Sequence, residues 1–279
     1  MPQLFVKRLT VIDFSYLDAD RGLVGESWQV DITLKGGLDQ QGMVLDFGDV
    51  KKSVKRLIDD HFDHKLLIPG KYPGVEINER HGQQHLSFTL SSGEVIHHSS
   101  PADAVTLIDS ASITTDVLST AIIDSVMPHM PDNVAAIEIH LWPEQSDGAF
   151  YHYSHGLKQH CGNCQRIAHG HRSNIKIERN GQADSRLEQA WAEQWRDIYI
   201  GSREDIVEDK EQQLLFGYQS EQGKFLLKLP SNRCYLIDTD STVENLAQHI
   251  ADTLKQQHPS DSFRVMAYEG VDKGAIGES

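Results

Sequence analysis

Short stretches in which hydrophobic and polar residues alternate, a pattern typical of β-strands, are separated along this chain by longer helix-like segments. The same series of elements is predicted twice. The leading series has a hairpin of 4–15 with 27–35, a helix at 48–61, a hairpin turning at 92–93, a helix at 114–126 and a strand at 134–141. The trailing series has a hairpin of 149–155 with 172–179, a helix at 184–196, a hairpin turning at 222–223, a helix at 242–256 and a strand at 263–268. Antiparallel sheet with two helices, repeated, predicts an α+β fold.

The residues repeat as well as the elements. The segment 106–110, Thr-Leu-Ile-Asp-Ser, matches 235–239, Tyr-Leu-Ile-Asp-Thr, and the flanking segments keep the same offset of 129 positions (Leu107 to Leu236). We therefore predict a tandem duplication into units 1–145 and 146–279, joined near 144–149. The spacing Ser241-x-x-Glu244 predicts a capping box at the start of the last helix.

Composition limits the classes of function. The net charge of −15 argues against nucleic-acid binding, which needs a basic surface, but a local group of cations can still hold an anionic small molecule. No apolar run approaches the ~18 residues of a membrane span, and residues 1–10 show no secretory signal. The three cysteines, all after residue 160, do not form a disulfide framework. We expect a cytoplasmic protein with no membrane or nucleic-acid partner.

A histidine pattern carries the candidate chemistry. His155 is followed after 13 residues by His169-Gly170-His171. Side chains at i and i+2 of a strand share a face, so His169 and His171 converge, and His155 can join them from an adjacent strand. Three imidazoles with an open fourth position are typical of a catalytic zinc site. A surface turn, a structural zinc site that includes Cys161 and Cys164, or a redox pair of these cysteines are the alternatives.

The motifs together resemble the family of 6-pyruvoyl-tetrahydropterin synthase and 6-carboxy-tetrahydropterin synthase, which has the tunnelling fold (T-fold). The leading copy has Gly-Met-Val-Leu-Asp-Phe at 42–47 and an Asp63-His64 pair, but Val-Gly-Glu at 24–26 where the family has His-Gly-His. The trailing copy has the histidines, the cysteine, Thr-Val-Glu-Asn at 242–245 and Glu269, but Arg-Asp at 196–197 where the family has Asp-His. Each copy keeps what the other lacks.

The resemblance implies a zinc-dependent lyase acting on 7,8-dihydroneopterin triphosphate. It implies metal ligands at His155, His169 and His171, a general base at Cys164, a proton-exchanging pair at Asp63 and His64, a pterin anchor at Glu269, and a substrate contact at Thr242. We favour formation of 6-carboxy-5,6,7,8-tetrahydropterin, which leads to queuosine and other 7-deazapurines. The alternatives are 6-pyruvoyl-tetrahydropterin synthase and a non-catalytic pterin- or purine-binding protein.

Several points stay open on the sequence alone. Cys161 competes with Cys164 as the base, and His152 and His160 compete as metal ligands. Thr242 also fits a helix N-terminus. The composite site can form within one chain or between chains, and the T-fold family predicts a homo-oligomeric barrel.

Overall fold

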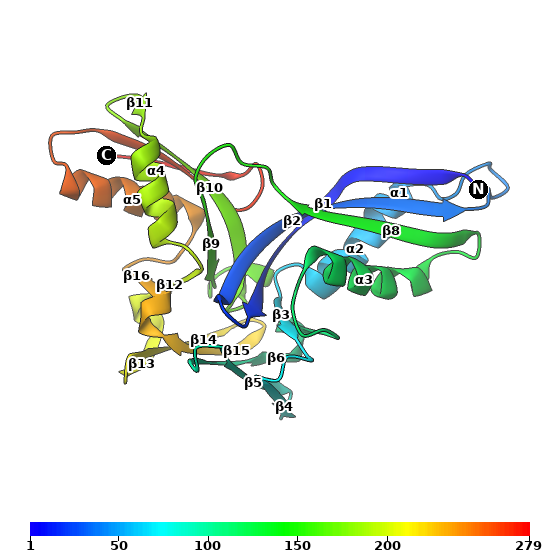
Figure 1. Cartoon of the computed structure of the whole chain (residues 1–279), viewed down its shortest axis with the longest axis horizontal. Helices are drawn as coiled ribbons and strands as arrows, with labels where there is room; N and C mark the ends of the chain where they lie inside the picture. The colour runs from blue at the N-terminus through cyan, green and yellow to red at the C-terminus, as the bar shows by residue number, and fades with distance from the viewer.

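The computed structural model describes residues 1–279 as three sheets with helices packed on two of them (Figure 1). The first sheet has the order β7-β3-β1-β2-β8. Its strands are β1 (Gln3–Asp18), β2 (Gly22–Gly36), β3 (Leu66–Pro69), β7 (Val105–Ile108) and β8 (Val134–Pro143). It is accompanied by α1 (Phe47–Asp49), the π-helical segment η1 (Val50–Val54), α2 (Lys55–Phe62), α3 (Thr115–Val126) and η3 (Met127–His129). One face of β1 and β2 packs on these helices through a core that includes Phe14, Val30 and Ile58.

The second sheet repeats this plan in the trailing half, in the order β16-β12-β9-β10-β17-β18. Its strands are β9 (Phe150–His155), β10 (His169–Arg179), β11 (Gln182–Ala183, paired with β10), β12 (Ile198–Ser202), β16 (Cys234–Ile237), β17 (Phe263–Tyr268) and β18 (Gly274–Glu278). It is accompanied by η4 (Asn163–Gln165), α4 (Ser185–Gln194) and α5 (Val243–Gln257). A separate core, which includes Tyr151, Trp195 and Ile250, joins these helices to the sheet.

The third sheet is built by both halves of the chain, in the order β13-β14-β15-β6-β5-β4. Its strands are β4 (Val75–Arg80), β5 (Gln83–Thr89), β6 (Val95–Pro101), β13 (Ile206–Lys210), β14 (Gln213–Ser220) and β15 (Gly223–Pro230), with short 3₁₀ turns η2 (Ala102–Ala104), η5 (Arg203–Asp205) and η6 (Ser231–Arg233) beside them. The halves join where Leu227 of β15 pairs antiparallel with His98 of β6. Backbone hydrogen bonds of this sheet therefore hold the two copies together.

The two long hairpins cross at the centre of the molecule (Figure 1). Gly25 of β2 and Gly170 of β10 lie at the crossing, where a Cβ on Gly25 would come within 1.8 Å of the Tyr153 carbonyl oxygen. The hydroxyls of Ser15 and Ser154 lie 2.7 Å apart at the same place. Only small side chains allow backbones to approach this closely.

Every predicted hairpin, helix and closing strand is present within a few residues of its predicted bounds. The fold is a mixture of sheets and few helices, as predicted, although the pairings β1–β3, β3–β7, β9–β12 and β12–β16 are parallel. The predicted capping box was wrong. Thr242, not Ser241, is the N-cap of α5 and accepts from the Asn245 amide at 3.4 Å. The side chain of Ser241 does not cap the helix, because its hydroxyl contacts the imidazole of His155.

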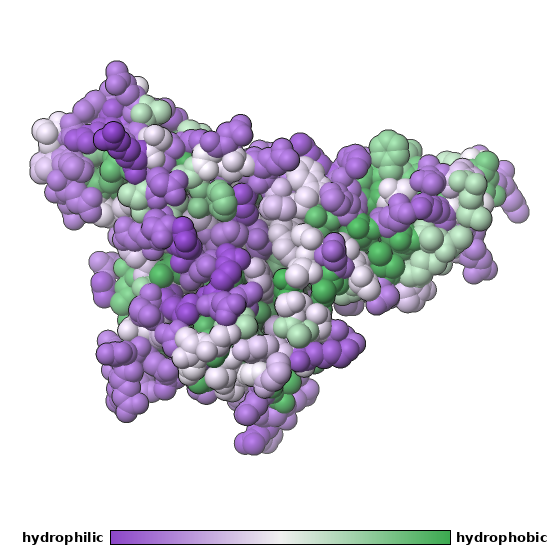
Figure 2. Space-filling view, viewed as in Figure 1, coloured by the Kyte–Doolittle hydropathy of each residue, from purple (hydrophilic) through white to green (hydrophobic).

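Exposed apolar side chains gather on the arm formed by the first sheet and its helices, which is the greener part of the surface in Figure 2. Met1, Phe5, Leu38 and Phe47 belong to this arm and are each more than half exposed. None of the helices combines the length with the apolar composition that crossing a membrane would need.

We predict that Gly25→Ala destabilises the protein by about 3 kcal/mol, the upper end of the usual cost of overpacking, because the new methyl group meets backbone atoms that cannot move aside. Chemical unfolding would measure the loss. Gly37→Ala is the matched control, since nothing lies within 4 Å of a Cβ at that position. Equal stability of the two variants would show that the hairpins do not cross as described.

Candidate functional site

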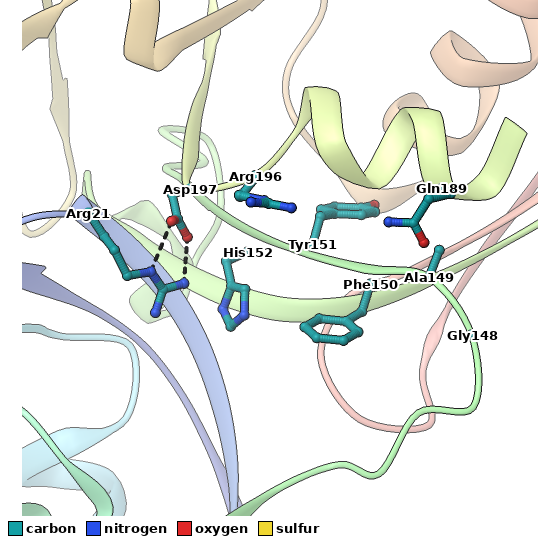
Figure 3. A pocket seen from close by; sticks show the side chains of 9 residues that line it. All are labelled: Arg21, Gly148, Ala149, Phe150, Tyr151, His152, Gln189, Arg196 and Asp197. Carbon is teal, nitrogen blue, oxygen red and sulfur yellow. Dashed lines mark hydrogen bonds and ion pairs between the residues drawn. The ribbon is translucent and has the colours of Figure 1, made fainter. Parts of the chain in front are cut away.

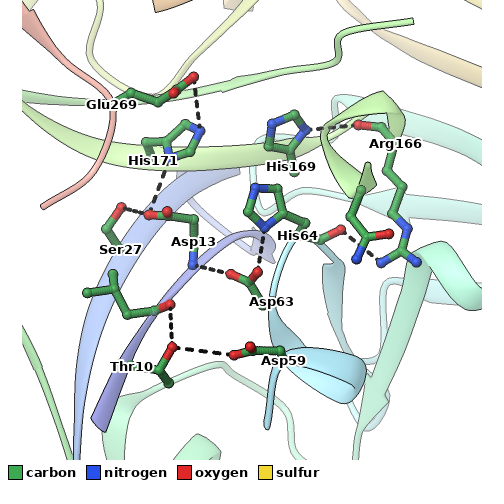
Figure 4. A network of polar contacts seen from close by, with 12 residues as sticks. Thr10, Asp13, Ser27, Asp59, Asp63, His64, Arg166, His169, His171 and Glu269 are labelled. Atoms are coloured by element: carbon green, nitrogen blue, oxygen red, sulfur yellow. Dashed lines mark hydrogen bonds and ion pairs between the residues drawn. The ribbon is translucent and has the colours of Figure 1, made fainter. Parts of the chain in front are cut away.

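Three histidines of the trailing hairpin form one buried cluster beside the crossing. Figure 4 shows two of them, His169 and His171, with the residues around them. His155 of β9 pairs directly with His169 of β10, and His171 lies two residues further on the same face. One ring nitrogen from each lies within 4.8 Å of the others, and each residue is at most 1% exposed. The structure thus brings together the three imidazoles that the sequence pattern selected.

Each imidazole has an oxygen close to its Nδ1. That of His155 is 3.0 Å from the Ser241 carbonyl oxygen and 3.1 Å from its hydroxyl, and that of His169 is 3.0 Å from the Arg166 carbonyl oxygen. The Nδ1 of His171 is 3.2 Å from Asp13 Oδ1. The three Nε2 atoms are buried and have no hydrogen-bond partner. In His155 and His169 an oxygen on Nδ1 leaves the lone pair of Nε2 available to a metal, which fits metal ligation. The Nδ1 of His171 faces the Asp13 carboxylate at ion-pair distance without forming a hydrogen bond.

The pKa values of two of these histidines also fit metal ligation. Burial, followed by the neighbouring imidazoles, lowers the pKa of His155 and His169 well below the usual value. Both rings are therefore neutral near pH 7, which is the form that binds metals.

Asp13 of β1 connects the two halves of the site. Its carboxylate contacts His171, accepts from Ser27 Oγ at 2.5 Å and pairs with Lys273 at 3.0 Å. Burial raises the pKa of Asp13, but His171 and then Lys273 outweigh it and hold the pKa well below its usual range. The carboxylate is thus charged, and the leading copy contributes an anion to the cluster of the trailing copy.

Asp63 and His64 lie next to the imidazoles in the same chain. Asp63 ends α2 and accepts from the Asp13 amide at 2.8 Å, while its second oxygen is 2.6 Å from His64 Nδ1. His64 has a left-handed backbone (φ +52°), its amide donates to the Asp13 carbonyl, and its ring stacks on His169 at 5.1 Å between centroids. Burial lowers the pKa of His64, but the hydrogen bond with Asp63 and the nearby Cys164 sulfur raise it to about 10.

Cys164 is the cysteine beside these rings. Its sulfur and ring nitrogens of His64 and His169 lie within 4.8 Å of one another, whereas Cys161 is exposed and belongs to no such group. The competing histidines lie elsewhere. His152 contacts the Gly25 carbonyl at 2.8 Å, and His160 is exposed in the loop before η4.

The two predicted substrate residues differ in position. Glu269, just after β17, reaches the cluster, with Oε1 4.0 Å from His155 Nε2 and 3.9 Å from His171 Nε2. Thr242 caps α5, and its contact with a substrate stays a prediction.

The leading hairpin has no histidine cluster at the positions that correspond to the three imidazoles. Tyr16, Val24 and Glu26 occupy the positions that correspond to His155, His169 and His171 in the strand pairing. Arg21 binds Asp197 there, with nitrogen–oxygen distances of 2.9 and 2.6 Å (Figure 3). An adjacent cavity of about 430 Å³ is lined by both residues and by His152, Phe150 and Arg196. The absence of three imidazoles here leaves one candidate metal centre in the chain.

Asp13, Ser241 and Lys273 were not selected from the sequence. Asp13 lies between the apolar residues Ile12 and Phe14 in a predicted strand, which is an available signal, because buried carboxylates need partners. Ser241 and Lys273 have no such signal, since their role depends on how β9, α5 and the β17–β18 turn come together.

Comparison with known proteins gives two matches to one family model, 6-pyruvoyl tetrahydropterin synthase, at residues 14–154 and 148–277. A protein of Pyrococcus abyssi (strain GE5 / Orsay), provisionally named 6-carboxy-5,6,7,8-tetrahydropterin synthase, is 21% identical over 133 residues, which is 48% of this chain and 76% of that protein. A protein of Pyrococcus horikoshii with the same name is 20% identical over the same shares.

Solved structures give weaker similarities. The 6-pyruvoyl tetrahydropterin synthase of Plasmodium vivax is 19% identical, with a TM-score of 0.42, over 52% of this chain and 93% of that one. The enzyme of Plasmodium falciparum is 16% identical, with a TM-score of 0.41, over 50% and 90%. The double match of the family model covers nearly the whole chain. The chain belongs to the 6-pyruvoyl tetrahydropterin synthase family, whose members are lyases, in a tandem form.

Proposed function

We propose that this chain is a zinc-dependent lyase similar to 6-carboxy-5,6,7,8-tetrahydropterin synthase, acting on 7,8-dihydroneopterin triphosphate in the pathway to queuosine and other 7-deazapurines. One observation carries the proposal. Three buried imidazoles with free Nε2 atoms lie beside Cys164 and the Asp63–His64 pair, and all of them belong to one chain.

The donor set suits zinc, which accepts imidazole nitrogens and in catalytic sites keeps one position open. His155, His169 and His171 would hold the ion. When bound, zinc supplies a Lewis acid that polarises the hydroxyl oxygens of the substrate side chain.

The proton-handling groups, Cys164 and the Asp63–His64 pair, lie next to each other. In the proposed reaction, Cys164 Sγ removes a proton from a carbon of the substrate side chain, and His64 Nε2 exchanges a proton at the second carbon. Asp63 holds His64 Nδ1, so that Nε2 is the nitrogen directed to the substrate. With its pKa raised to about 10, His64 is protonated at neutral pH and begins the cycle as the acid.

Glu269 would hold the pterin ring. Its side chain is 24% exposed, so a ligand can reach the carboxylate. A carboxylate accepts two parallel N–H bonds, and the amino-pyrimidine edge of a pterin offers such a pair. The position of Glu269 beside His155 and His171 would place the ring next to the metal centre.

The choice of product rests on the curated relatives, both of which carry the 6-carboxy-tetrahydropterin synthase name. The family model itself carries the name of the 6-pyruvoyl enzyme, which makes that product the second candidate. A non-catalytic pterin-binding protein is less favoured, because such a protein has no need of a cysteine and a hydrogen-bonded Asp–His pair beside the metal ligands.

We also propose a cytoplasmic homo-oligomer in which the units join as a T-fold barrel. The strands β7 and β8 end the first sheet with free edges, and apolar side chains are exposed on the same arm. Unpaired edges favour association, and closure of a barrel removes them.

Because His64 and Cys164 meet within one chain, variants that lack one or the other should not complement each other. We predict that His64→Ala and Cys164→Ala each lower kcat by about 100-fold or more. A mixture of the two, unfolded and reassembled together, should remain as slow as the separate variants. Release of triphosphate from 7,8-dihydroneopterin triphosphate measures this, and the same reaction products distinguish the 6-carboxy from the 6-pyruvoyl compound. Recovery of activity on mixing would place the two residues in different chains.

Asp13→Asn should weaken zinc binding by about 10- to 100-fold, since the carboxylate that orients His171 is lost. Competition with a chromophoric chelator measures the affinity. Asp31→Asn is the matched control, because Asp31 is also a buried carboxylate paired with a lysine, Lys7, but lies away from the imidazoles. An unchanged affinity in Asp13→Asn would remove Asp13 from the site.

A further inference from the structure

Glu269 lies in a short turn, residues 269–273, that follows the last paired residues of β17 and β18, Tyr268 and Gly274. Its Oε1 is 4.0 Å from His155 Nε2 and 3.9 Å from His171 Nε2, and both distances exceed that of a hydrogen bond. The contacts with the imidazoles therefore do not fix the carboxylate. Its position depends on the backbone of the turn.

The turn is tied to the leading copy at Lys273. The Lys273 ammonium donates to Asp13 Oδ2 at 3.0 Å, across 260 positions of the chain. The Lys273 side chain is 52% exposed, whereas that of Asp13 is only 5% exposed. The carbonyl oxygen of Lys273 accepts from the Glu269 amide at 3.0 Å. Lys273 thus contacts the buried carboxylate through its side chain and Glu269 through its backbone.

Gly270 makes a second contact with Asp13. Its backbone has φ +74°, and a Cβ at this position would lie 2.5 Å from Asp13 Oδ1. The Gly270 amide donates to Ser173 Oγ of β10 at 3.3 Å. The backbone of the turn therefore packs directly on the Asp13 carboxylate, which a residue with a side chain would prevent.

The tip of the turn, Val271 and Asp272, is less closely packed than its two ends. A cavity of about 480 Å³ borders the tip, and its other lining residues include Arg8, Gln29 and Trp142 of the leading copy. Because side chains do not fill this space, the turn depends on the contacts of Gly270 and Lys273 for its position on the leading copy.

We propose that Lys273 is a positioning residue, whose ion pair with Asp13 holds the turn so that the Glu269 carboxylate faces the imidazoles. The effect on a bound pterin rests on the proposed function, which assigns Glu269 as the pterin anchor. Asp13 would then serve both parts of the site, since its Oδ1 faces His171 and its Oδ2 holds the turn. Figure 4 shows Glu269 and Asp13 at different nitrogens of the His171 ring.

Amide hydrogen exchange of the ligand-free protein tests the hold on the turn. Lys273→Met should speed exchange in residues 269–273 by about fivefold or more, because the turn loses its ion pair. Lys273→Arg should exchange like the parent, since arginine keeps the charge and the donors. Lys7→Met is the matched control, because Lys7 also pairs with a buried carboxylate, that of Asp31 at 2.9 Å, away from the turn.

Binding of 7,8-dihydroneopterin to the zinc-loaded protein, measured by calorimetry, tests the effect on Glu269. Lys273→Met should weaken binding by about fivefold or more, while Lys273→Arg and Lys7→Met should bind like the parent. Gly270→Ala keeps the lysine but disturbs the turn, and it should weaken binding as well. Zinc content and thermal unfolding check that each variant folds.

A double-mutant cycle with Glu269→Gln shows whether Lys273 acts through Glu269. In the Glu269→Gln protein, Lys273→Met should have little further effect on dihydroneopterin binding. Additive losses would show that Lys273 acts on the ligand independently, and they would overturn the positioning role.

The exchange measurement separates this inference from the proposed function. Parent-like exchange in Lys273→Met overturns the positioning role, even if the parent converts dihydroneopterin triphosphate. Faster exchange in Lys273→Met, with a parent that neither binds nor converts the pterin, supports the hold of Lys273 on the turn and contradicts the lyase.

Discussion

The close crossing of the two long hairpins is the constraint on which the candidate site depends. Gly25 and Gly170 let the backbones meet, and the hydroxyls of Ser15 and Ser154 contact each other at that point. Asp13 lies two residues from Ser15 on the same face of β1, so its carboxylate faces His171. A bulkier residue at either glycine would separate the carboxylate from the imidazole that it orients. The crossing therefore converts two incomplete copies into one site.

The crossing also explains why the two sides differ. In the strand pairing His171 corresponds to Glu26, and Asp13 to His152, so the carboxylate and the imidazole have exchanged places on the second side. Burial raises the pKa of Glu26 to about 7 and lowers that of His152 to about 4, which weakens any charge on this pair. Arg21 and Asp197 bind each other where the first side has its Asp–His pair. One side has the three imidazoles, and the other has an internal ion pair between Arg21 and Asp197.

The charge near the imidazoles differs from that of the chain as a whole. The chain is strongly acidic, yet the residues close to the imidazoles include the cations Lys273 and Arg166. Lys273 pairs with Asp13, and Arg166 donates hydrogen bonds to Gln222 and to the His64 carbonyl. An acidic chain with few local cations does not suit nucleic acid, because a polyanion needs an extended basic face.

Much of this architecture could be read from the sequence because it is local. Alternating strands, turns at Gly93 and Gly223 and the i, i+2 spacing of His169 and His171 depend on neighbours in the chain, and the structure has them within a few residues of the predicted bounds. The capping of α5 was predicted one residue early, since Ser241 and Thr242 are equally suited to a cap. Thr242 is the cap because the hydroxyl of Ser241 contacts His155. A contact between residues so far apart in the sequence cannot be predicted from a local pattern.

The sequence by itself determined the inventory: three histidines, a cysteine before them, an Asp–His pair and a glutamate, divided between two copies of one unit. Only the tertiary structure decided that His64 stacks on His169 within a single chain and that the Asp13 carboxylate faces His171. The physical reason is that these contacts join residues far apart in the sequence. The distances between these residues depend on how closely the two hairpins approach each other. Gly25, Gly170 and the six-stranded sheet shared by both halves set this approach.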